Sequence, residues 1–214
     1  NQAIHENDWA DWIYVKSIYP NKGFTGGNNA ILEDFINSTD IPDFFLLLNA
    51  DTIIPEGSIV ELLHAAENNP DYGLYSPLLK NEDSCYKFKS PISEFLEAAE
   101  TGFLDKIFSR WVIQLNESPK IPLEVEWTAF ACVLIRKEVF LDVGLLDERY
   151  FLYFDDIDYC RSARNAGWKT LHWPYSTVIH LEGQSNPVIE YTNKRKLLPE
   201  YWYRSRSCYY KKFY

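Results

Sequence analysis

Three acidic residues within four positions are the group in this chain best suited to proton transfer. Asp155, Asp156 and Asp158 follow an aromatic run that begins at Phe151, and they precede a segment with the pattern of a helix. The first turn of a helix has unpaired N–H groups and the positive end of its dipole, which favour charged carboxylates. Aspartate is also a common helix cap, but a cap needs only one of the three. The aromatic lead-in predicts a partly dry site, which suits a general base.

Other polar residues follow short apolar runs. The run Phe44–Leu48 has the length of a buried parallel strand, and it stops at Asn49 and Asp51. In open α/β sheets, ligands bind outside the carboxyl ends of the strands, so Asp51 is expected where it could bind the metal ion of a metal-bound phosphate. A second apolar run ends at His180. Ordinary turn chemistry also explains Asn49 and Asp51, and a lone histidine at a strand end is often only a hydrogen-bonded polar residue.

In their order, these segments resemble the inverting glycosyltransferases of family 2, which have the GT-A fold. The resemblance runs from about Asn21 to Ser185, and the bacterial polysaccharide enzymes, rhamnosyltransferases among them, are the most similar. The matching motifs are the glycine- and asparagine-rich loop Asn21–Asn29, the strand that ends in Asn49-Ala50-Asp51, the helix start Pro55-Glu56-Gly57, Glu126-Trp127, Val143–Glu148, Asp155-Asp156 with Asp158, Ala166-Gly167-Trp168 and His180.

The resemblance implies a role for each matching residue. Asp156 matches the second acid of the family's Glu-Asp pair and is the expected general base, and Asp155 stands where glutamate is usual. Asp51 and His180 are the expected ligands of a divalent metal, Mg²⁺ or Mn²⁺, shared with two diphosphate oxygens. Asp158 is expected to cap the helix or to orient a neighbour. Contacts to the nucleotide sugar are expected from Gly26, Gly27, Asn28, Asn29, Asn49, Asp51 and Trp127.

Two positions depart from the family pattern in ways that bear on the donor. Asn49 replaces the first acid of the family's strand-end pair and gives up a negative charge, although its amide can still bond the ribose or a metal-bound water. Phe130 replaces a glycine that usually follows Trp127 by three positions, which would reshape the donor pocket. Trp127 itself fits stacking on a sugar face and a place in the core equally well.

The resemblance implies metal-assisted transfer of a sugar from a nucleoside-diphosphate sugar to a hydroxyl of a glycan or lipid-linked acceptor. Asp156 would take the proton of that hydroxyl, and a single displacement would invert the anomeric configuration. Two other classes stay open. One is a non-catalytic module that binds nucleotide sugars or glycans, which would have lost the base. The other is a nucleotidyltransferase, which needs a basic phosphate-binding loop where this chain offers only Lys22.

Composition narrows the class of protein. The 214 residues, 46% of them hydrophobic, fit one globular domain with a substantial core. A formal net charge of −10 argues against a nucleic-acid partner, and a divalent metal would supply the positive charge that an anionic donor needs. The four cysteines are scattered, and Cys132 and Cys160 stand in apolar or helical contexts typical of buried thiols. A reducing cytosol is therefore the expected compartment.

Alternating apolar and amphipathic segments predict an α/β fold with a Rossmann-like mixed sheet flanked by helices. We expect a single GT-A domain over residues 1–186. The family's first strand should precede Ile13–Val15 and is not found there, so the domain is expected to lack it at its N-terminal side. The expected strands are Trp12–Ile18, Phe44–Leu48, Tyr72–Ser76, Val125–Ile135, Thr170–Trp173 and Thr177–His180. The expected helices are Asn29–Ile36, Ser58–Asn68, Glu94–Val112, Lys137–Val143 and Asp156–Asn165.

The last segment, residues 187–214, is expected to be a basic, aromatic helical tail. From Lys194 to Tyr214 it carries seven Lys and Arg residues among seven aromatic residues, in an otherwise acidic chain. Such a helix can lie on an anionic membrane or meet a lipid-linked acceptor, which would place the protein at the inner face of the membrane. It can equally pack its aromatic side chains on the domain and display its charges to water.

Overall fold

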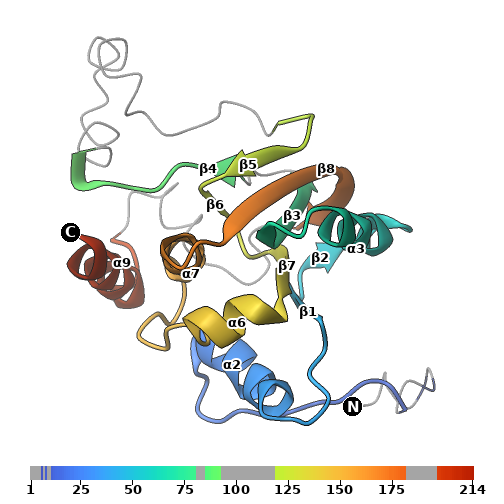
Figure 1. Ribbon diagram of the computed structural model, residues 1–214. Coiled ribbons are helices and arrows are strands. Elements are labelled where there is room, and N and C mark those ends of the chain that lie inside the picture. Colours follow the sequence, from blue (N-terminus) through green and yellow to red (C-terminus); the bar gives the residue numbers. More distant parts are fainter. Residues whose placement is uncertain (1–5, 7, 9–10, 81–84, 93–118, 182–196) are drawn as a thin grey trace.

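The fold is a mixed β-sheet covered by helices on both faces, as Figure 1 shows for the computed structural model. The structure describes residues 6, 8, 11–80, 85–92, 119–181 and 197–214. The strands are β1 (Phe44–Leu48), β2 (Thr52–Ile53), β3 (Tyr72–Lys80), β4 (Cys85–Tyr86), β5 (Leu123–Val125), β6 (Trp127–Thr128), β7 (Cys132–Arg136) and β8 (Lys169–His180). The helices are α2 (Gly23–Ile36), α3 (Ser58–Asn68), α6 (Lys137–Val143), α7 (Asp155–Asn165) and α9 (Glu200–Phe213).

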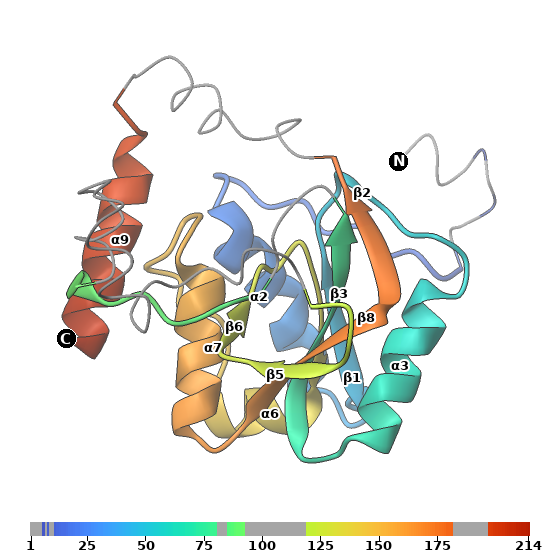
Figure 2. The same ribbon diagram turned by 90° about the horizontal axis from the view of Figure 1, so that it is seen from above.

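The sheet topology brings three strand ends to one edge. The strand order is β1-β7-β3-β8-β2, with β5 paired to β8 and a separate pair β4-β6. Strand β7 is antiparallel to both β1 and β3, and β3 is parallel to β8, so β1, β3 and β8 all run the same way. Their carboxyl ends therefore lie at the same edge, at the top of Figure 2.

Each face of the sheet has its own helices because side chains alternate along a strand. Leu74 and Ile135 pack with α2, α6 and α7 in the larger core cluster. Their neighbours Tyr75 and Leu134 point the other way and pack with Leu62 and other residues of α3. Figure 2 shows α2, α6 and α7 on one side of the sheet and α3 on the other. This confirms the α/β fold class.

Several predicted elements are confirmed with their boundaries. Strand β1 and helices α3 and α6 begin and end where the sequence predicts, and α7 begins one residue earlier. Gly144 and Gly167 follow α6 and α7 with φ of 87° and 100°, conformations that stop a helix and that glycine adopts without strain. The predicted helix Glu94–Val112 lies outside the described residues. No helix among the described residues is long and apolar enough to cross a membrane.

The predicted strand Trp12–Ile18 is wrong. Residues 13–18 have no regular secondary structure, and no strand of the sheet comes from this segment. Trp12, Tyr14 and Val15 are 70%, 69% and 49% exposed. The apolar side chains that suggested a strand are therefore not buried against the sheet.

The strand boundaries in the second half differ from prediction because pairing partners decide them. The predicted strand Val125–Ile135 is three strands, since β5 pairs with β8, β6 with β4, and β7 with β1 and β3. The two predicted strands Thr170–Trp173 and Thr177–His180 are one strand, β8. Its register against β3 shifts after Trp173, next to Pro174, which cannot donate to the ladder.

Candidate active site

Polar side chains from two strand ends meet at the edge of the sheet. Asn49 and Asp51 follow β1, and His180 ends β8, where it pairs with Thr52 of β2. This pairing brings Asp51 to the histidine, with Oδ1 3.2 Å from Nε2 and side chains 14% and 13% exposed. The amide nitrogen of Asn49 lies 3.4 Å from the same Nε2 atom. Residues far apart in the sequence thus form one polar group, and its binding of a metal stays a prediction.

The donor set of this group fits a divalent cation. A carboxylate oxygen and the lone pair of a neutral imidazole, here Asp51 Oδ1 and His180 Nε2, are both donors that a divalent cation accepts. Two ligands about 2.1 Å from an ion and at right angles lie about 3.0 Å apart, near the Asp51–His180 separation. Among the described residues, no group of three or more His, Cys, Asp or Glu side chains is arranged to hold a metal ion, so an ion here would also need oxygens from its substrate.

The acidic cluster begins α7. Asp155 is 6% exposed, and burial, followed by the adjacent Asp156 charge, raises the pKa of its carboxyl well above the usual range. Asp156 is half-buried, and burial raises its pKa to about 6 although its Oδ1 accepts the Ile157 N–H at 2.8 Å. A carboxylate with this pKa is ionised at neutral pH and is still basic enough to take a proton.

The turn before α7 has an unusual backbone. Tyr153 and Phe154 have φ of 66° and 63°, a left-handed conformation that costs residues with a Cβ about 1–3 kcal/mol each. The buried Phe154 ring holds the turn, with its centroid 5.6 Å from that of Trp202 and 5.8 Å from that of Tyr209. Strain of this kind clusters at functional sites, and here it immediately precedes the two candidate acids.

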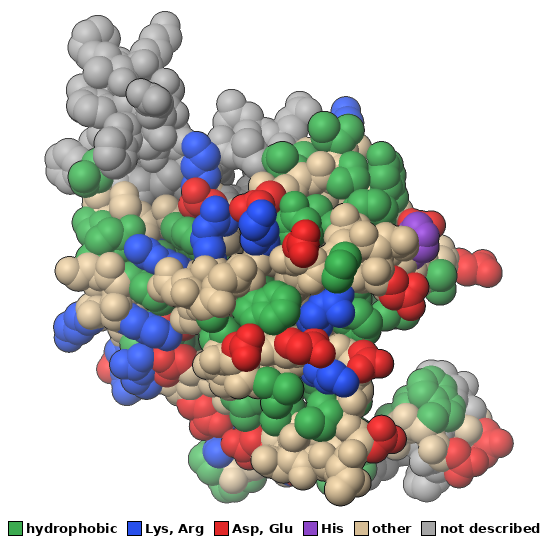
Figure 3. Space-filling model, in the orientation of Figure 1, with side chains coloured by type: hydrophobic (Ala, Val, Ile, Leu, Met, Phe, Trp, Pro, Cys, Tyr) green, Lys and Arg blue, Asp and Glu red, His purple; other side chains and the backbone are tan. Residues whose placement is uncertain are grey.

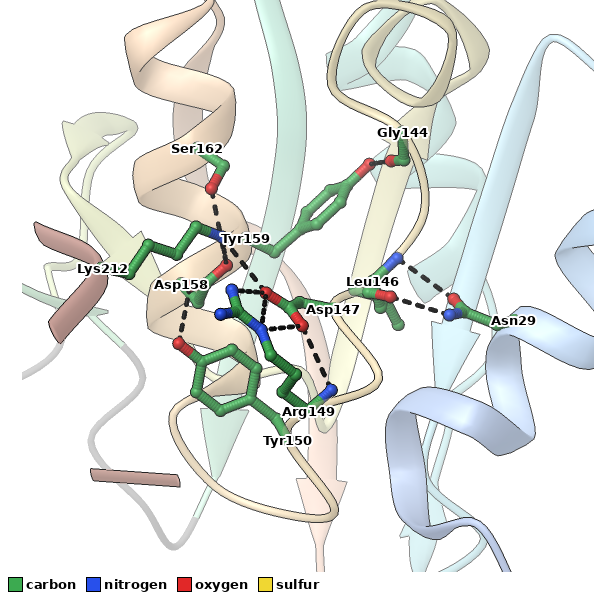
Figure 4. Close-up of polar contacts among 10 residues, drawn as sticks. All are labelled: Asn29, Gly144, Leu146, Asp147, Arg149, Tyr150, Asp158, Tyr159, Ser162 and Lys212. Carbon is green, nitrogen blue, oxygen red and sulfur yellow. Dashed lines mark hydrogen bonds and ion pairs between the residues drawn. The ribbon is translucent and has the colours of Figure 1, made fainter. Parts of the chain in front are cut away.

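Asp158 serves a different purpose from its neighbours. It is 3% exposed, and Figure 4 shows it among side chains from α9 and from the loop between α6 and α7, residues 144–154, which we call the acidic loop. The Tyr150 hydroxyl donates to its Oδ2 at 2.7 Å, and Lys212 Nζ lies 2.7 Å from Oδ1. The N-cap residue of α7 is Phe154, which makes no side-chain capping bond, and the first-turn N–H of Ile157 is bonded by Asp156. Bonding of the helix start therefore does not account for Asp158, whose partners are Tyr150 and Lys212.

The predicted glycine- and asparagine-rich loop is wrong, because these residues form the first turns of α2. The helix starts at Gly23, where an added Cβ would meet the Phe151 carbonyl oxygen at 1.9 Å. The amide of Asn29 donates to Leu146 O at 2.7 Å, and its Oδ1 accepts the Leu146 N–H at 3.1 Å. Thr25 donates its hydroxyl to Tyr150 O. These residues clamp the loop that leads to the acids.

The expected nucleotide contacts of this segment stay predictions. Gly26 is packed, since an added Cβ would lie 2.5 Å from the Lys22 Cβ, whereas nothing lies within 4 Å of a Cβ added at Gly27. The Asn28 amide donates to the Phe24 carbonyl within the helix at 2.8 Å.

Trp127 lies in the core. It is 8% exposed, and its indole N–H donates to the Lys87 carbonyl at 2.7 Å. Phe130 is 4% exposed and packs edge-on against Tyr159 at 6.1 Å between ring centroids. The structure thus gives Trp127 the core position that the sequence left open, and stacking of Trp127 on a sugar stays a prediction.

Sequence patterns missed the partners of the acidic cluster. Nothing near Asp158 in the chain points to Lys212, which is 54 positions away. The only available signal was the helical spacing of Tyr209 and Lys212, which places both on one side of α9.

The two parts of the site lie at one end of the molecule. Helix α7 is joined to β8 by the short turn Ala166–Trp168, so the helix runs back along the sheet against the direction of β8. Its first turn, with Asp155 and Asp156, therefore lies toward the edge where β1 and β8 end (Figure 2). This is the edge at which ligands bind in open α/β sheets.

Known proteins resemble this chain in sequence and in fold. The profile of a family described as "Glycosyltransferase like family 2" matches residues 13–197. An N-acetylglucosaminyl-diphospho-decaprenol L-rhamnosyltransferase of Mycobacterium tuberculosis is 30% identical over 150 residues, which cover 68% of this chain and 49% of the relative. The low-salt glycan biosynthesis hexosyltransferase Agl10 of Haloferax volcanii is 28% identical over 147 residues, 67% of this chain and 44% of the relative. The chain thus spans about half the length of these relatives.

A solved structure of GalNAc-T7 with UDP, GalNAc and Mn²⁺ superposes with a TM-score of 0.57 at 15% identity, over 87% of this chain and 36% of that chain. This likeness concerns the fold, and it agrees with the GT-A architecture of a central mixed sheet between helices.

Proposed function

The chain belongs to the glycosyltransferase-like family 2, and we propose that it is an inverting transferase acting on a nucleoside-diphosphate sugar. The sugar goes to a hydroxyl of a glycan or lipid-linked acceptor. One observation carries this proposal. Asp51 and His180 lie in contact at one edge of the sheet, and the first turn of α7, which contains Asp156, lies toward the same edge. The name of the mycobacterial relative, which specifies a diphospho-decaprenol substrate, supports a lipid-linked acceptor.

Asp51 and His180 are the proposed holders of a divalent ion, Mg²⁺ or Mn²⁺, with Asn49 beside them. Such an ion, when bound, neutralises the negative charge that develops on a departing diphosphate. The chain carries a net charge of −10, so its own side chains supply little positive charge overall for that purpose. The Asn49 side chain, 3.4 Å from His180 Nε2, is proposed to bond the ribose or a metal-bound water.

Asp156 is the proposed general base. Its carboxylate accepts the proton of the acceptor hydroxyl while that oxygen forms a bond to the anomeric carbon. The bond from the same carbon to the diphosphate oxygen breaks on the opposite face, so the configuration inverts without a covalent intermediate. Asp155, which is more deeply buried, is proposed to contact the acceptor.

The C-terminal helix is proposed to bring the site to a membrane that holds the acceptor. Ser205 and Tyr209 of α9 are buried, so the helix packs on the domain, while Arg204 and Lys211 are exposed. Figure 3 shows Lys and Arg side chains gathered over this part of the surface. Such a basic face is attracted to anionic lipids, which supports a place at the cytoplasmic face of the membrane.

Calorimetric titration with a nucleoside diphosphate tests the metal role. We expect binding in Mn²⁺ that weakens strongly in chelator, because the strand-end group offers few positive charges of its own. Asp51→Ala should abolish most of the metal-dependent affinity, and His180→Ala should reduce it more mildly.

Asp43→Ala is the matched control for this titration. Asp43 precedes the same strand at its opposite end, where its Oδ1 lies 2.7 Å from Lys137 Nζ, and its loss should leave the affinity unchanged. Equal affinity of the unmodified protein in chelator and in Mn²⁺ would rule out the metal site.

A further inference from the structure

We propose that Lys212, on the last turn of α9, is a positioning residue that compensates the charge of the buried Asp158 and so weakens the effect of this charge on the Asp155–Asp156 pair. Its consequence for catalysis rests on the proposed function. The same contact makes α9 a part of the acidic site and more than a surface helix.

The contact is direct, and its carboxylate partner is shielded from water. Lys212 Nζ lies 2.7 Å from Asp158 Oδ1 and 3.5 Å from Asp147 Oδ2. The side chain of Asp158 is 4% exposed, and that of Lys212 is 29% exposed. Figure 4 shows the lysine reaching from α9 between the two carboxylates. A carboxylate buried to this degree is costly unless a cation or hydrogen bonds compensate it.

Other contacts hold α9 in the place from which Lys212 reaches Asp158. The Tyr209 hydroxyl accepts a hydrogen bond from Arg161 of α7 at 2.9 Å. The guanidinium of Arg161 also lies 4.5 Å from the Phe213 ring centroid and 4.7 Å from that of Tyr214. Ser205 donates to the Leu152 carbonyl at 3.0 Å. The helix is thus attached both to α7 and to the loop before it.

Asp158 is placed so that its charge reaches the candidate acids. Asp155 and Asp158 are three residues apart in α7 and therefore lie on the same face of the helix. A like charge at this spacing raises the proton affinity of a carboxylate. The negative charge of Asp158 contributes in this way to the raised pKa of Asp155.

The other charged and titratable side chains around the acidic cluster either contact residues other than Asp158 or carry no positive charge. Arg149 is engaged by Asp147, with Nη2 2.5 Å from Oδ2. The Tyr150 hydroxyl donates to Asp158, and the thiol of Cys208 lies beside that hydroxyl. Lys89, after β4, acts on Asp156 and lowers its pKa against the effect of burial. Within the described residues, Lys212 is the cation that contacts Asp158. Tyr153 also interacts electrostatically with Asp155, Tyr209 with Asp158, and the buried Cys160 thiol with Asp156 and Asp158.

Carbon-detected NMR titration of the Asp155 and Asp156 carboxyl groups in the full chain tests the inference without an enzyme assay. Lys212→Met removes the charge but keeps most of the stem, and it should raise the titration midpoint of the pair by about half a pH unit. Lys212→Arg should restore the wild-type midpoint. The double variant Lys212→Met with Asp158→Asn should also restore it, because a neutral amide needs no cation. Unmoved midpoints in Lys212→Met would overturn the proposal.

Two further variants keep the test decisive. Lys211→Met removes the neighbouring charge from the same helix and should leave both midpoints unchanged. If Lys212→Met does not fold, Asp158→Asn alone should lower the midpoint of Asp155, and an unmoved midpoint there overturns the proposal equally.

The pH profile of kcat/KM separates this inference from the proposed function. We expect its acidic limb to move with the carboxyl midpoints, so that Lys212→Met is about threefold less active below the limb and near wild type above it. Midpoints that move while the limb stays fixed would leave the positioning role of Lys212 intact and would refute Asp156 as the base.

Discussion

At the scale of single residues, three acids that look equivalent in the sequence have different surroundings. Asp155 and Asp156 begin α7, whereas Asp158 points into a buried network with Tyr150 and Lys212. The residue types and their spacing located the cluster, and the resemblance to family 2 led us to expect Asp51 and His180 at one site. They could not separate Asp158 from the others, because its partner comes from another element far along the chain.

The raised pKa of Asp156 predicts a pH dependence of stability. Burial raises this pKa to about 6, whereas an aspartate in an unfolded chain titrates near 3.9. Between these values the folded state binds more protons, so this residue's contribution to the free energy of unfolding falls as the pH rises through that window. We expect the free energy of unfolding, measured in urea, to differ between Asp156→Asn and wild type in a pH-dependent way. The value for Asp156→Asn minus the value for wild type should be about 1–2 kcal/mol larger at pH 7.5 than at pH 4. Parallel changes in the two proteins between these pH values would show that Asp156 is not buried in this way.

At the scale of elements, the local sequence correctly predicted those helices whose boundaries depend on their own residues. Helix α3 follows from apolar periodicity and α7 from the acids at its start, and for α6 and α7 a glycine at positive φ follows the helix. Local signals failed where pairing decides, as in residues 125–135, which divide among three strands with different partners. They also failed for α2, since the glycines and asparagines that suggested a ligand loop instead allow a helix to approach the acidic loop closely.

The clamp between α2 and the acidic loop can be tested through Asn29. Its side chain bonds both the C=O and the N–H of Leu146, and it is 3% exposed. Asn29→Ala leaves both backbone groups buried and unpaired, which should lower the free energy of unfolding by about 2–4 kcal/mol.

Asn37→Ala is the matched control in the same denaturant titrations. The Asn37 amide bonds only the Glu33 carbonyl at the exposed end of α2, so its loss should cost less than about 1 kcal/mol. Equal losses in the two variants would contradict the clamp.

At the scale of the whole molecule, the basic helix α9 of an acidic protein is also packed on its core. The net charge is −10, yet α9 holds Arg204, Arg206, Lys211 and Lys212. The sequence left packing and membrane contact as alternatives, and the helix can serve both, since Tyr209 is buried while Arg204 and Lys211 are exposed. Removing the whole tail would therefore damage the domain as well as its surface charge.

Vesicle binding tests the membrane face without disturbing the core. Arg204→Gln combined with Lys211→Gln should weaken binding to anionic vesicles at low salt by about 1 kcal/mol per charge. Lys137→Gln, on α6, should have no such effect, and no variant should bind zwitterionic vesicles differently. Unchanged binding of the double variant to anionic vesicles would leave α9 as a packed helix only.

The most direct test of the catalytic proposal is turnover of a nucleotide-sugar substrate by Asp156→Asn, measured with donor affinity on the same preparation. The amide keeps the shape of the side chain but cannot accept the acceptor's proton, so turnover should fall about 10²–10⁴-fold while donor binding survives. Asp155→Asn and Asp158→Asn should lose less. Wild-type turnover in Asp156→Asn with a large loss in either control would assign the base to another carboxylate, and full turnover in all three would contradict a catalytic role for the acidic cluster.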